Sequence, residues 1–374
     1  DEADVIVLVV DGRVGLTNED ENVMNILHRS NKPVIVAANK IDDIKFIDNV
    51  YEFYNLGIGE PLPISSLNQL GVGDVLDAIC EKLPEEQENE ASDNNETITN
   101  ETTNIPNKDI PQGSIEEKDF VLESNGYKLN AVYTYIDDGN AHPAVLLIAG
   151  SGPSDYDETL GTLKPFKDIA NGLAKEGINS LRVDKRTFSY AANFDIKCGI
   201  EEEYLDDCNT AIEYLKSQNI SGLYLLGHSL GGQIATELAA SIEGIDGMIL
   251  FNSSARHLAD IACDQYSALD PVNKESYITY AETAKNATAS SAKGYYYYSA
   301  SDYYWVSYNQ IDVAKNISNA NIKTLIINSK FDKQSFDEDL NLWPTLFSDS
   351  ANVSICVYDD ISHFGFKIDT TDPS

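Results

Sequence analysis

The sequence predicts an α/β fold with a doubly wound, mostly parallel sheet. Short apolar runs typical of buried strands alternate with stretches of helical spacing along most of the 374 residues. One such strand, residues 222–226, leads into Gly227-His228-Ser229-Leu230-Gly231-Gly232 and then into the helical stretch 233–240. In this strand–turn–helix context, Gly-x-Ser-x-Gly predicts a strained turn that exposes a serine.

The composition is that of a globular protein with a large excess of acids. The chain is 42% hydrophobic and has a formal net charge of −35. Nucleic-acid phosphates require a basic footprint, so this charge argues against a nucleic-acid partner. No apolar run is long enough to span a membrane, and no signal peptide is visible, although the chain starts at Asp1 rather than at methionine. We therefore expect a cytoplasmic protein with no membrane partner.

The cysteines predict neither a disulfide framework nor a zinc site. They are scattered, odd in number, and form no Cys-x-x-Cys. Reduced, mostly structural thiols are expected at Cys80, Cys198, Cys208, Cys263 and Cys356.

The first 84 residues combine two predicted strands with a motif typical of nucleotide binding. Residues 4–11 and 33–38 are apolar runs that predict buried parallel strands, and 18–30 has the spacing of an amphipathic helix. The tetrad Asn39-Lys40-Ile41-Asp42 directly follows the second strand.

This tetrad resembles the guanine-reading motif of small GTPases. The resemblance implies that Asp42 would accept hydrogen bonds from the guanine, that the Lys40 stem would cover the base, and that Asn39 would brace the loop. Ser65 lies where such GTPases place their last nucleotide-contacting loop.

Two longer stretches resemble one GTPase family. Residues 11–17 and 56–65 are similar to the first domain of the Der (EngA) family, the tandem GTPases of ribosome assembly. The resemblance covers only residues 1–84 and begins after that family's phosphate loop. No Gly-x-x-x-x-Gly-Lys-Ser/Thr occurs in the chain, so nothing is expected to cradle phosphates or hold Mg²⁺. We predict a truncated GTPase segment that arose by fusion, truncation or assembly, with GTP as a partner only if the segment is functional.

An acidic linker is predicted between the two parts of the chain. Residues 85–119 are rich in Glu, Asn, Thr, Asp and Ser and contain few large apolar side chains. Such a stretch cannot bury enough apolar surface to offset the entropy lost on ordering. We therefore expect a disordered, solvated spacer.

Residues 120–374 contain the predicted elements of one α/β domain. An antiparallel pair opens it at 120–123 and 129–136. Further buried strands are expected at 144–149, 177–184, 222–226, 247–251, 324–328 and 352–358, and helices at 166–176 and 201–218. The Tyr-rich insertion 255–316 would cap the site, either as a substrate-facing wall or as a lid that packs its own core.

Several motifs in this region resemble those of the α/β-hydrolase superfamily. Residues 150–158 read Gly-Ser-Gly-Pro-Ser-Asp-Tyr-Asp-Glu, similar to a signature of bacterial esterases related to the serine aminopeptidase and dienelactone hydrolase branches. Residues 164–170 and 182–187 match the same group. That group usually has histidine before the first glycine, where this chain has Ala149. The resemblance covers about 120–374 and implies an α/β-hydrolase fold with a cap.

A hydrolase of this type needs a nucleophile, a base and an acid. The Ser229 hydroxyl is inert at neutral pH unless a base takes its proton. His363 follows the last strand, where the base is expected. Asp332 follows strand 324–328, where the family places the acid that orients the imidazole. The order Ser229, Asp332, His363 is the one expected for this fold.

Other charged residues are interpreted as structural. Asp337 and Asp339 are rivals to Asp332, but they fall in the predicted first turn of a helix, where a carboxylate commonly caps the backbone. Asp184 and Arg186 are interpreted as a structural pair. No catalytic role is predicted for His28, His142, His228 and His257.

The predicted function is that of a serine hydrolase that cleaves small-molecule carboxylic esters through an acyl-enzyme. The backbone N–H groups of Ser151 and Leu230 would form the oxyanion hole, and no metal or cofactor is needed. Peptidase or thioesterase activity would use the same machinery. The alternative from another class is a GTP-binding ribosome-assembly protein, which residues 39–42 motivate.

Overall fold

The computed structural model divides the chain into two units, residues 1–107 with 160–162 and residues 108–159 with 163–374. The structure describes residues 5–17, 32–41, 61–64 and single positions up to Lys82, then 113–160, 163–190, 197–298, 300–332, 334 and 336–367. Each unit is described by itself.

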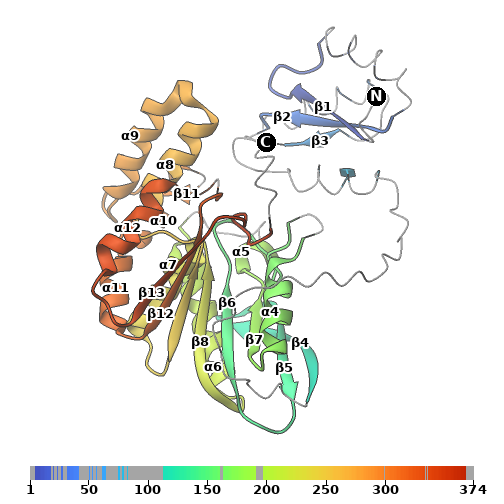
Figure 1. Ribbon diagram of the computed structural model, residues 1–374. Helices are drawn as coiled ribbons and strands as arrows, with labels where there is room; N and C mark the ends of the chain where they lie inside the picture. Colours follow the sequence, from blue (N-terminus) through green and yellow to red (C-terminus); the bar gives the residue numbers. More distant parts are fainter. Residues whose placement is uncertain are drawn as a thin grey trace. The chain divides into compact units, whose positions relative to one another are not determined.

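The N-terminal unit contains a small parallel sheet (Figure 1). Strand β1 (Ile6–Asp11) pairs with β2 (Val34–Asn39), which pairs with β3 (Leu62–Pro63). The central strand β2 is buried along most of its length, whereas β1 lies at the edge and is partly exposed. The strands predicted at 4–11 and 33–38 are confirmed. The predicted helix 18–30, apart from single positions, and the linker up to residue 112 lie outside the described residues.

The C-terminal unit is built on an eight-stranded, mostly parallel sheet. Its spatial order is β13-β12-β9-β8-β6-β7-β5-β4. Strands β4 and β5 form an antiparallel hairpin, β5 is antiparallel to β7, and the other neighbours are parallel. The strands are β4 (Ser114–Ser124), β5 (Tyr127–Asp137), β6 (His142–Ile148), β7 (Asn179–Val183), β8 (Ile220–His228), β9 (Gly247–Phe251), β12 (Lys323–Ser329) and β13 (Val353–Tyr358).

Strand β4 corrects the predicted linker, which was expected to extend to residue 119. Residues 114–119 pair with β5, from Ser114 opposite Asp137 to Asp119 opposite Val132. The polar composition misled the prediction because this edge strand exposes its side chains while its backbone is paired. Glu117 also forms an ion pair with the buried Arg182, with 2.6 Å between Oε1 and Nη2.

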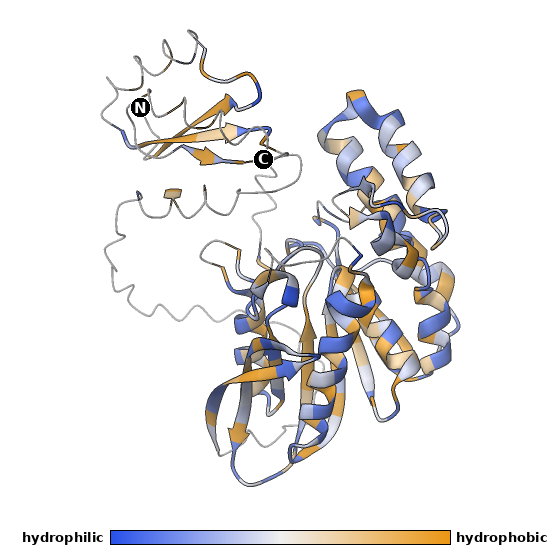
Figure 2. Ribbon diagram, turned by 180° about the vertical axis from the view of Figure 1, so that it is seen from behind, coloured by the Kyte–Doolittle hydropathy of each residue, from blue (hydrophilic) through white to orange (hydrophobic). Residues whose placement is uncertain are grey.

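Helices cover both faces of the sheet, as expected for a doubly wound fold. Side chains alternate along β6, so Val145 and Leu147 pack toward one face and Leu146 and Ile148 toward the other. Figure 2 shows largely hydrophobic strands between helices that carry both colours. One face is covered by α4 (Pro165–Lys175), and the other by α6 (Asp206–Lys216), α7 (Leu230–Ser241), α11 (Val313–Ala320) and α12 (Asp337–Phe347).

Two short segments follow β7. The helix α5 (Arg186–Ser189) comes directly after this strand. The helix predicted at 201–218 begins with a π-helical turn, η4 (Glu201–Leu205), and continues as α6. Such turns are rare and are found frequently at functional sites.

The predicted cap lies between β9 and β12. It contains α8 (Leu258–Leu269), the 3₁₀ turn η5 (Pro271–Asn273), α9 (Lys274–Lys285), the ribbon β10 (Tyr296–Tyr297) with β11 (Ala300–Ser301), and α10 (Asp302–Tyr308). Figure 1 shows α8 and α9 side by side at one end of the unit. Trp305 and Tyr308 are each 1% exposed and belong to the same apolar cluster as the central strands, so these two aromatic side chains pack inward. A substrate-facing role for the exposed Tyr295 and Tyr296 stays a prediction.

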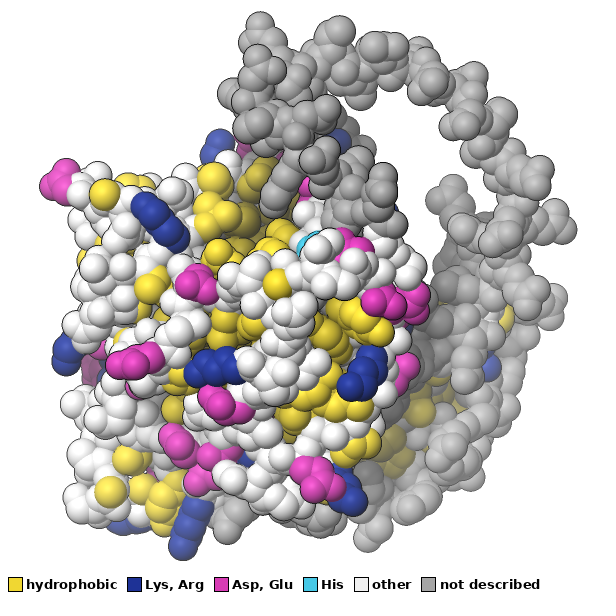
Figure 3. Space-filling view, turned by 90° about the horizontal axis from the view of Figure 1, so that it is seen from below, with side chains coloured by type: hydrophobic (Ala, Val, Ile, Leu, Met, Phe, Trp, Pro, Cys, Tyr) yellow, Lys and Arg dark blue, Asp and Glu magenta, His cyan; other side chains and the backbone are white. Residues whose placement is uncertain are grey.

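The described residues show no membrane helix and no metal cluster. None of the helices in this part of the chain has the length and apolar character needed to cross a bilayer. No group of His, Cys, Asp and Glu side chains there could hold a metal ion. Cys198, Cys208, Cys263 and Cys356 are free thiols. On the face seen in Figure 3, charged side chains of both signs are dispersed among apolar and uncharged ones.

Candidate active site

The predicted site residues of the C-terminal unit lie after the carboxyl ends of parallel strands. Ser229 directly follows β8, Asp332 follows β12, and His363 follows β13. Carboxyl ends of parallel strands meet at one edge of a sheet, and this edge is where α/β proteins place their sites.

Ser229 occupies a strained turn between β8 and α7. Its backbone has φ 53° and ψ −122°, a conformation that residues other than glycine rarely adopt. The Ser229 N–H donates a 2.9 Å hydrogen bond to the carbonyl oxygen of Phe251 at the end of β9. The strained serine turn predicted from the sequence is therefore present, and the neighbouring strand holds it.

The glycines of this turn are required by close backbone packing. A Cβ added at Gly227 would lie 2.1 Å from the carbonyl oxygen of Gly231. A Cβ added at Gly231 would lie 2.1 Å from the carbonyl oxygen of Ile148 in β6. Both contacts are with backbone, which cannot move aside without displacing a strand or a helix.

We expect Gly231→Ala to destabilise the C-terminal unit strongly. The clash exceeds ordinary overpacking, so the loss should reach about 3 kcal/mol, the upper end of the usual range. The measurement is urea unfolding followed by tryptophan fluorescence, since both tryptophans, Trp305 and Trp343, lie in this unit.

Gly172→Ala is the matched control for this substitution. Gly172 lies in α4, and an added Cβ there would have no atom within 4 Å. Because glycine disfavours a helix relative to alanine, Gly172→Ala should leave stability unchanged or raise it. Equal effects of the two substitutions would contradict the packing argument.

His363 and Asp332 form a buried hydrogen-bonded pair. The distance from His363 Nδ1 to Asp332 Oδ2 is 2.6 Å, and the two residues are 7% and 6% exposed. A carboxylate only accepts hydrogen bonds, so Nδ1 carries the hydrogen and Nε2 of the neutral ring keeps a free lone pair. Asp332 Oδ1 accepts the N–H of Gln334 at 2.7 Å, which fixes the carboxylate.

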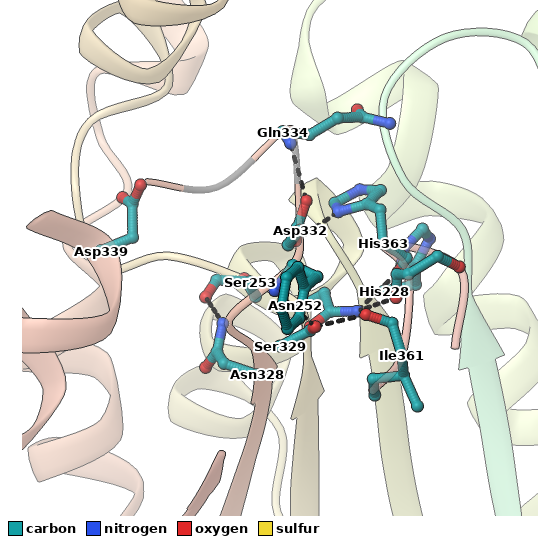
Figure 4. Close-up of polar contacts among 12 residues, drawn as sticks. His228, Asn252, Ser253, Asn328, Ser329, Asp332, Gln334, Asp339, Ile361 and His363 are labelled. Carbon is teal, nitrogen blue, oxygen red and sulfur yellow. Dashed lines mark hydrogen bonds and ion pairs between the residues drawn. The ribbon is translucent and has the colours of Figure 1, made fainter. Parts of the chain in front are cut away.

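The turn that carries His363 is tied to the ends of the neighbouring strands (Figure 4). The His363 carbonyl oxygen lies 2.6 Å from Asn252 Nδ2 and 3.0 Å from His228 Nε2. The Ser329 hydroxyl donates to the carbonyl oxygen of Ile361. Side chains at or just after the ends of β8, β9 and β12 therefore hold the backbone of the turn that carries His363.

His228 is a buried histidine beside this turn. Its Nδ1 lies 2.8 Å from Glu158 Oε1, and its Nε2 contacts the His363 carbonyl. A carboxylate and a carbonyl oxygen are both acceptors, so the two contacts favour the protonated ring. Burial disfavours the charged ring, but the attraction of Glu158 outweighs it and raises the pKa of His228. No role was predicted for His228 or Glu158, which are 70 residues apart.

The loop after β6 lies beside Ser229. A Cβ added at Gly150 would be 3.1 Å from Ser229 Cβ. The Gly150 N–H is already bonded to Glu158 Oε1 at 2.8 Å. By contrast, the Ser151 N–H has no hydrogen-bond partner among the residues that the structure describes. Leu230 is the first residue of α7, where backbone N–H groups lack helical partners.

Side chains at the end of β7 bind the loop after β6. These contacts join two motifs found in the sequence, residues 150–158 and 182–187. The buried Arg182 forms an ion pair with Asp157. Asp184 Oδ1 accepts the Tyr156 N–H at 2.8 Å. Loop and strand therefore form one polar network.

The predicted pairing of Asp184 with Arg186 is wrong. The Arg186 guanidinium binds Asp207 instead, with Nε 2.9 Å from Oδ2. Two residues apart on a continuing strand would point to the same face, but β7 ends at Val183 and Arg186 already lies in α5. Asp184 therefore turns to the loop, whereas Arg186 turns to α6.

The other acids considered for the triad, and the histidines His142 and His257, lie at positions with structural roles. Asp337 and Asp339 begin α12, and Asp339 Oδ2 accepts the Phe336 N–H at 2.8 Å, as expected for a helix cap. His142 Nε2 lies 3.0 Å from Asp138, and His257 caps α8. His28 lies outside the described residues.

The structure describes only part of the predicted nucleotide site. The Asn39 side chain accepts the Lys40 N–H at 2.8 Å, as a loop brace would. Lys40 Nζ forms a 2.8 Å ion pair with Asp11, which lowers the pKa of that carboxyl. Asp42 and Ser65 lie outside the described residues.

Comparison with known proteins finds similarity to a different family in each of the two parts of the chain. Residues 161–294 match the family model described as serine aminopeptidase, S33. The hydrolase resemblance is thereby confirmed. The C-terminal unit contains an α/β-hydrolase domain. Residues 1–85 match the elongation factor Tu GTP-binding domain, so the GTPase resemblance of the N-terminal segment is confirmed as well.

Two relatives illustrate this division. Esterase EstD from Thermotoga maritima is 33% identical over 255 residues, which are 67% of this chain and 60% of EstD. GTPase Der from Streptococcus agalactiae is 54% identical over 92 residues, which are 25% of this chain and 21% of Der. The chain thus spans less than two thirds of either relative.

Solved structures similar to the hydrolase domain include Est1E from Butyrivibrio proteoclasticus. It is 14% identical, with a TM-score of 0.47, over 66% of this chain and 90% of Est1E.

Proposed function

We propose that the hydrolase domain is a serine hydrolase that cleaves small carboxylic esters. The observation that carries the proposal is the 2.6 Å contact between His363 Nδ1 and Asp332 Oδ2 at the sheet edge where the strained Ser229 turn lies. The similarity to an esterase, EstD, supports an ester substrate.

The proposed reaction has two steps of the same kind. The Ser229 oxygen attacks the ester carbonyl carbon while His363 Nε2 takes the hydroxyl proton. The imidazolium then gives this proton to the leaving alcohol, and an acyl-serine remains. Water, deprotonated by the same nitrogen, attacks the acyl-serine and releases the carboxylic acid and free Ser229. Asp332 stays ionised and stabilises the imidazolium throughout.

The carbonyl oxygen becomes negatively charged in both steps and needs donors. The Ser151 and Leu230 N–H groups are the proposed oxyanion hole. A donor of this type contributes roughly 3 kcal/mol to transition-state stabilisation. The pairing of the Gly150 N–H with Glu158 supports Ser151 as the donor from this loop.

The proposal is tested by labelling with a fluorophosphonate probe, followed by peptide mass spectrometry. We expect a single phosphonyl adduct on the peptide that contains Ser229, and no adduct after heat denaturation. Parallel assays with a p-nitrophenyl ester, the matching anilide and the matching thioester compare leaving groups. An adduct on another residue, or turnover of the anilide alone, would contradict the esterase proposal.

The pH profile of ester hydrolysis should report His363. Burial disfavours the charged ring more than Asp332 favours it, so the pKa of His363 lies below its usual value of 6.5. Only the neutral ring can accept the serine proton. We therefore expect kcat/KM to rise with pH and to level off with an apparent pKa below 6.5. An apparent pKa above about 7 would contradict this assignment.

GTP binding by the N-terminal segment is a second candidate function. The Asn39–Lys40 contact and the similarity to Der favour it. Calorimetric titration of the whole chain with GTP and Mg²⁺ decides. A dissociation constant below about 1 mM would support binding, and the absence of heat at that level would exclude a useful site.

A further inference from the structure

A buried lysine and tyrosine lie beneath the proposed oxyanion loop, and the mechanism above does not use them. Lys185 lies between β7 and α5, directly after Asp184, and Tyr204 lies in the π-helical turn η4. They are 6% and 2% exposed. Desolvating an ammonium group is costly, so its position requires good partners.

The two side chains converge on the carbonyl oxygens of the loop. Lys185 Nζ lies 3.1 Å from the Gly150 oxygen and 2.6 Å from the Gly152 oxygen. Tyr204 accepts from Lys185 Nζ at 2.6 Å, and its hydroxyl donates to the Gly150 oxygen. Glu203 balances the charge, with 2.9 Å between Oε1 and Lys185 Nζ.

The Tyr204 hydroxyl keeps its proton in this position. Burial, together with the neighbouring Glu203, raises the pKa of Tyr204 well above its usual value of 10. The neutral phenol can therefore donate to the Gly150 oxygen while it accepts from the ammonium.

The geometry of the peptide bond links these contacts to Ser151. The carbonyl of Gly150 and the N–H of Ser151 belong to one planar trans peptide, so they point in opposite directions. Lys185 and Tyr204 both donate to the Gly150 carbonyl oxygen and so fix the orientation of this peptide plane. The direction of the Ser151 N–H is thereby fixed as well. The Gly150 N–H cannot replace it, because Glu158 holds that group.

We infer that Tyr204 and Lys185 are positioning residues that orient the Ser151 N–H as an oxyanion donor. This inference rests on the proposed esterase function. Removing the Tyr204 hydroxyl leaves the proposed triad and the aromatic ring of residue 204 in place. The Gly150 carbonyl oxygen then loses one of its two hydrogen-bond donors. Because small misplacements of a catalytic group are costly, kcat should fall roughly 10- to 100-fold with KM changed less than about twofold.

The test compares Tyr204→Phe with Tyr133→Phe. The control tyrosine is also buried, and its hydroxyl accepts from Asn179 Nδ2 at 3.0 Å, at the opposite end of β7. For each variant we would measure kcat and KM for p-nitrophenyl butyrate, the inhibition constant of an alkyl trifluoromethyl ketone, and the melting temperature. The ketone forms a hemiketal oxyanion with an active serine, so its affinity reports the hole directly.

We expect Tyr204→Phe to raise the inhibition constant by the same factor by which it lowers kcat. Tyr133→Phe should change neither, even if both variants melt at similarly reduced temperatures. Wild-type kcat and inhibition in Tyr204→Phe would overturn the inference, as would a loss of kcat with unchanged ketone affinity. If Tyr204→Phe does not fold, the charge-balanced variant Lys185→Met/Glu203→Gln carries the same expectation. An inactive wild-type protein would overturn the proposed function itself, and this inference with it.

Discussion

Ser229→Ala should abolish ester hydrolysis, with kcat falling by about 10⁶, the loss expected when a triad nucleophile is removed. Alanine keeps the backbone of the strained turn and the Leu230 N–H, so substrate binding and the oxyanion hole remain. What disappears is the hydroxyl oxygen that we propose as the nucleophile. KM should therefore change little, and labelling by the fluorophosphonate should vanish.

Ser318→Ala is the matched control for this experiment. Ser318 is exposed on α11, and its hydroxyl donates to the backbone oxygen of Ala314. It should keep wild-type kcat and labelling. Ester turnover by Ser229→Ala within a hundredfold of wild type would show that another residue attacks the ester.

The serine turn and the positions of its partners could be predicted because they depend on local patterns. A buried strand, a glycine-rich turn and a helix are contiguous in sequence, and the steric need for Gly227 and Gly231 follows from that arrangement. His363 and Asp332 were placed by chain order after two strands. Their 2.6 Å contact then follows from the parallel sheet, which brings the carboxyl ends of those strands together.

The supporting residues could not be predicted because their partners are remote in sequence. Glu158 reaches His228 across 70 residues, and Tyr204 reaches Gly150 across 54. Nothing in the sequence separates these residues from other buried polar groups until the fold fixes which carbonyl and which carboxylate they meet. Strand β4 was missed at residues 114–119 for a related reason, since its pairing with β5 depends on long-range contacts and its side chains are exposed.

Asp332→Asn should lower kcat about 10⁴-fold, the loss expected when the base is held in the wrong tautomer. The structure shows why the amide cannot adapt. The Gln334 N–H points at Oδ1, so in the variant the amide oxygen must occupy that position. The amide NH₂ group then faces His363 Nδ1 and requires it to accept. The ring hydrogen moves to Nε2, where it blocks removal of the Ser229 proton.

Asp337→Asn separates this tautomer effect from a general loss of acidic charge. It makes the same chemical change in the first turn of α12, five residues further along the chain. We expect wild-type kcat for Asp337→Asn, and for Asp332→Asn a KM close to wild type, because the amide still fills the site and still bonds both neighbours. Measuring kcat and KM of ester hydrolysis for the two variants decides whether Asp332 or Asp337 is the acid. If Asp332→Asn kept more than about a tenth of the wild-type kcat, the acid would not be Asp332, because a wrong tautomer cannot be that active.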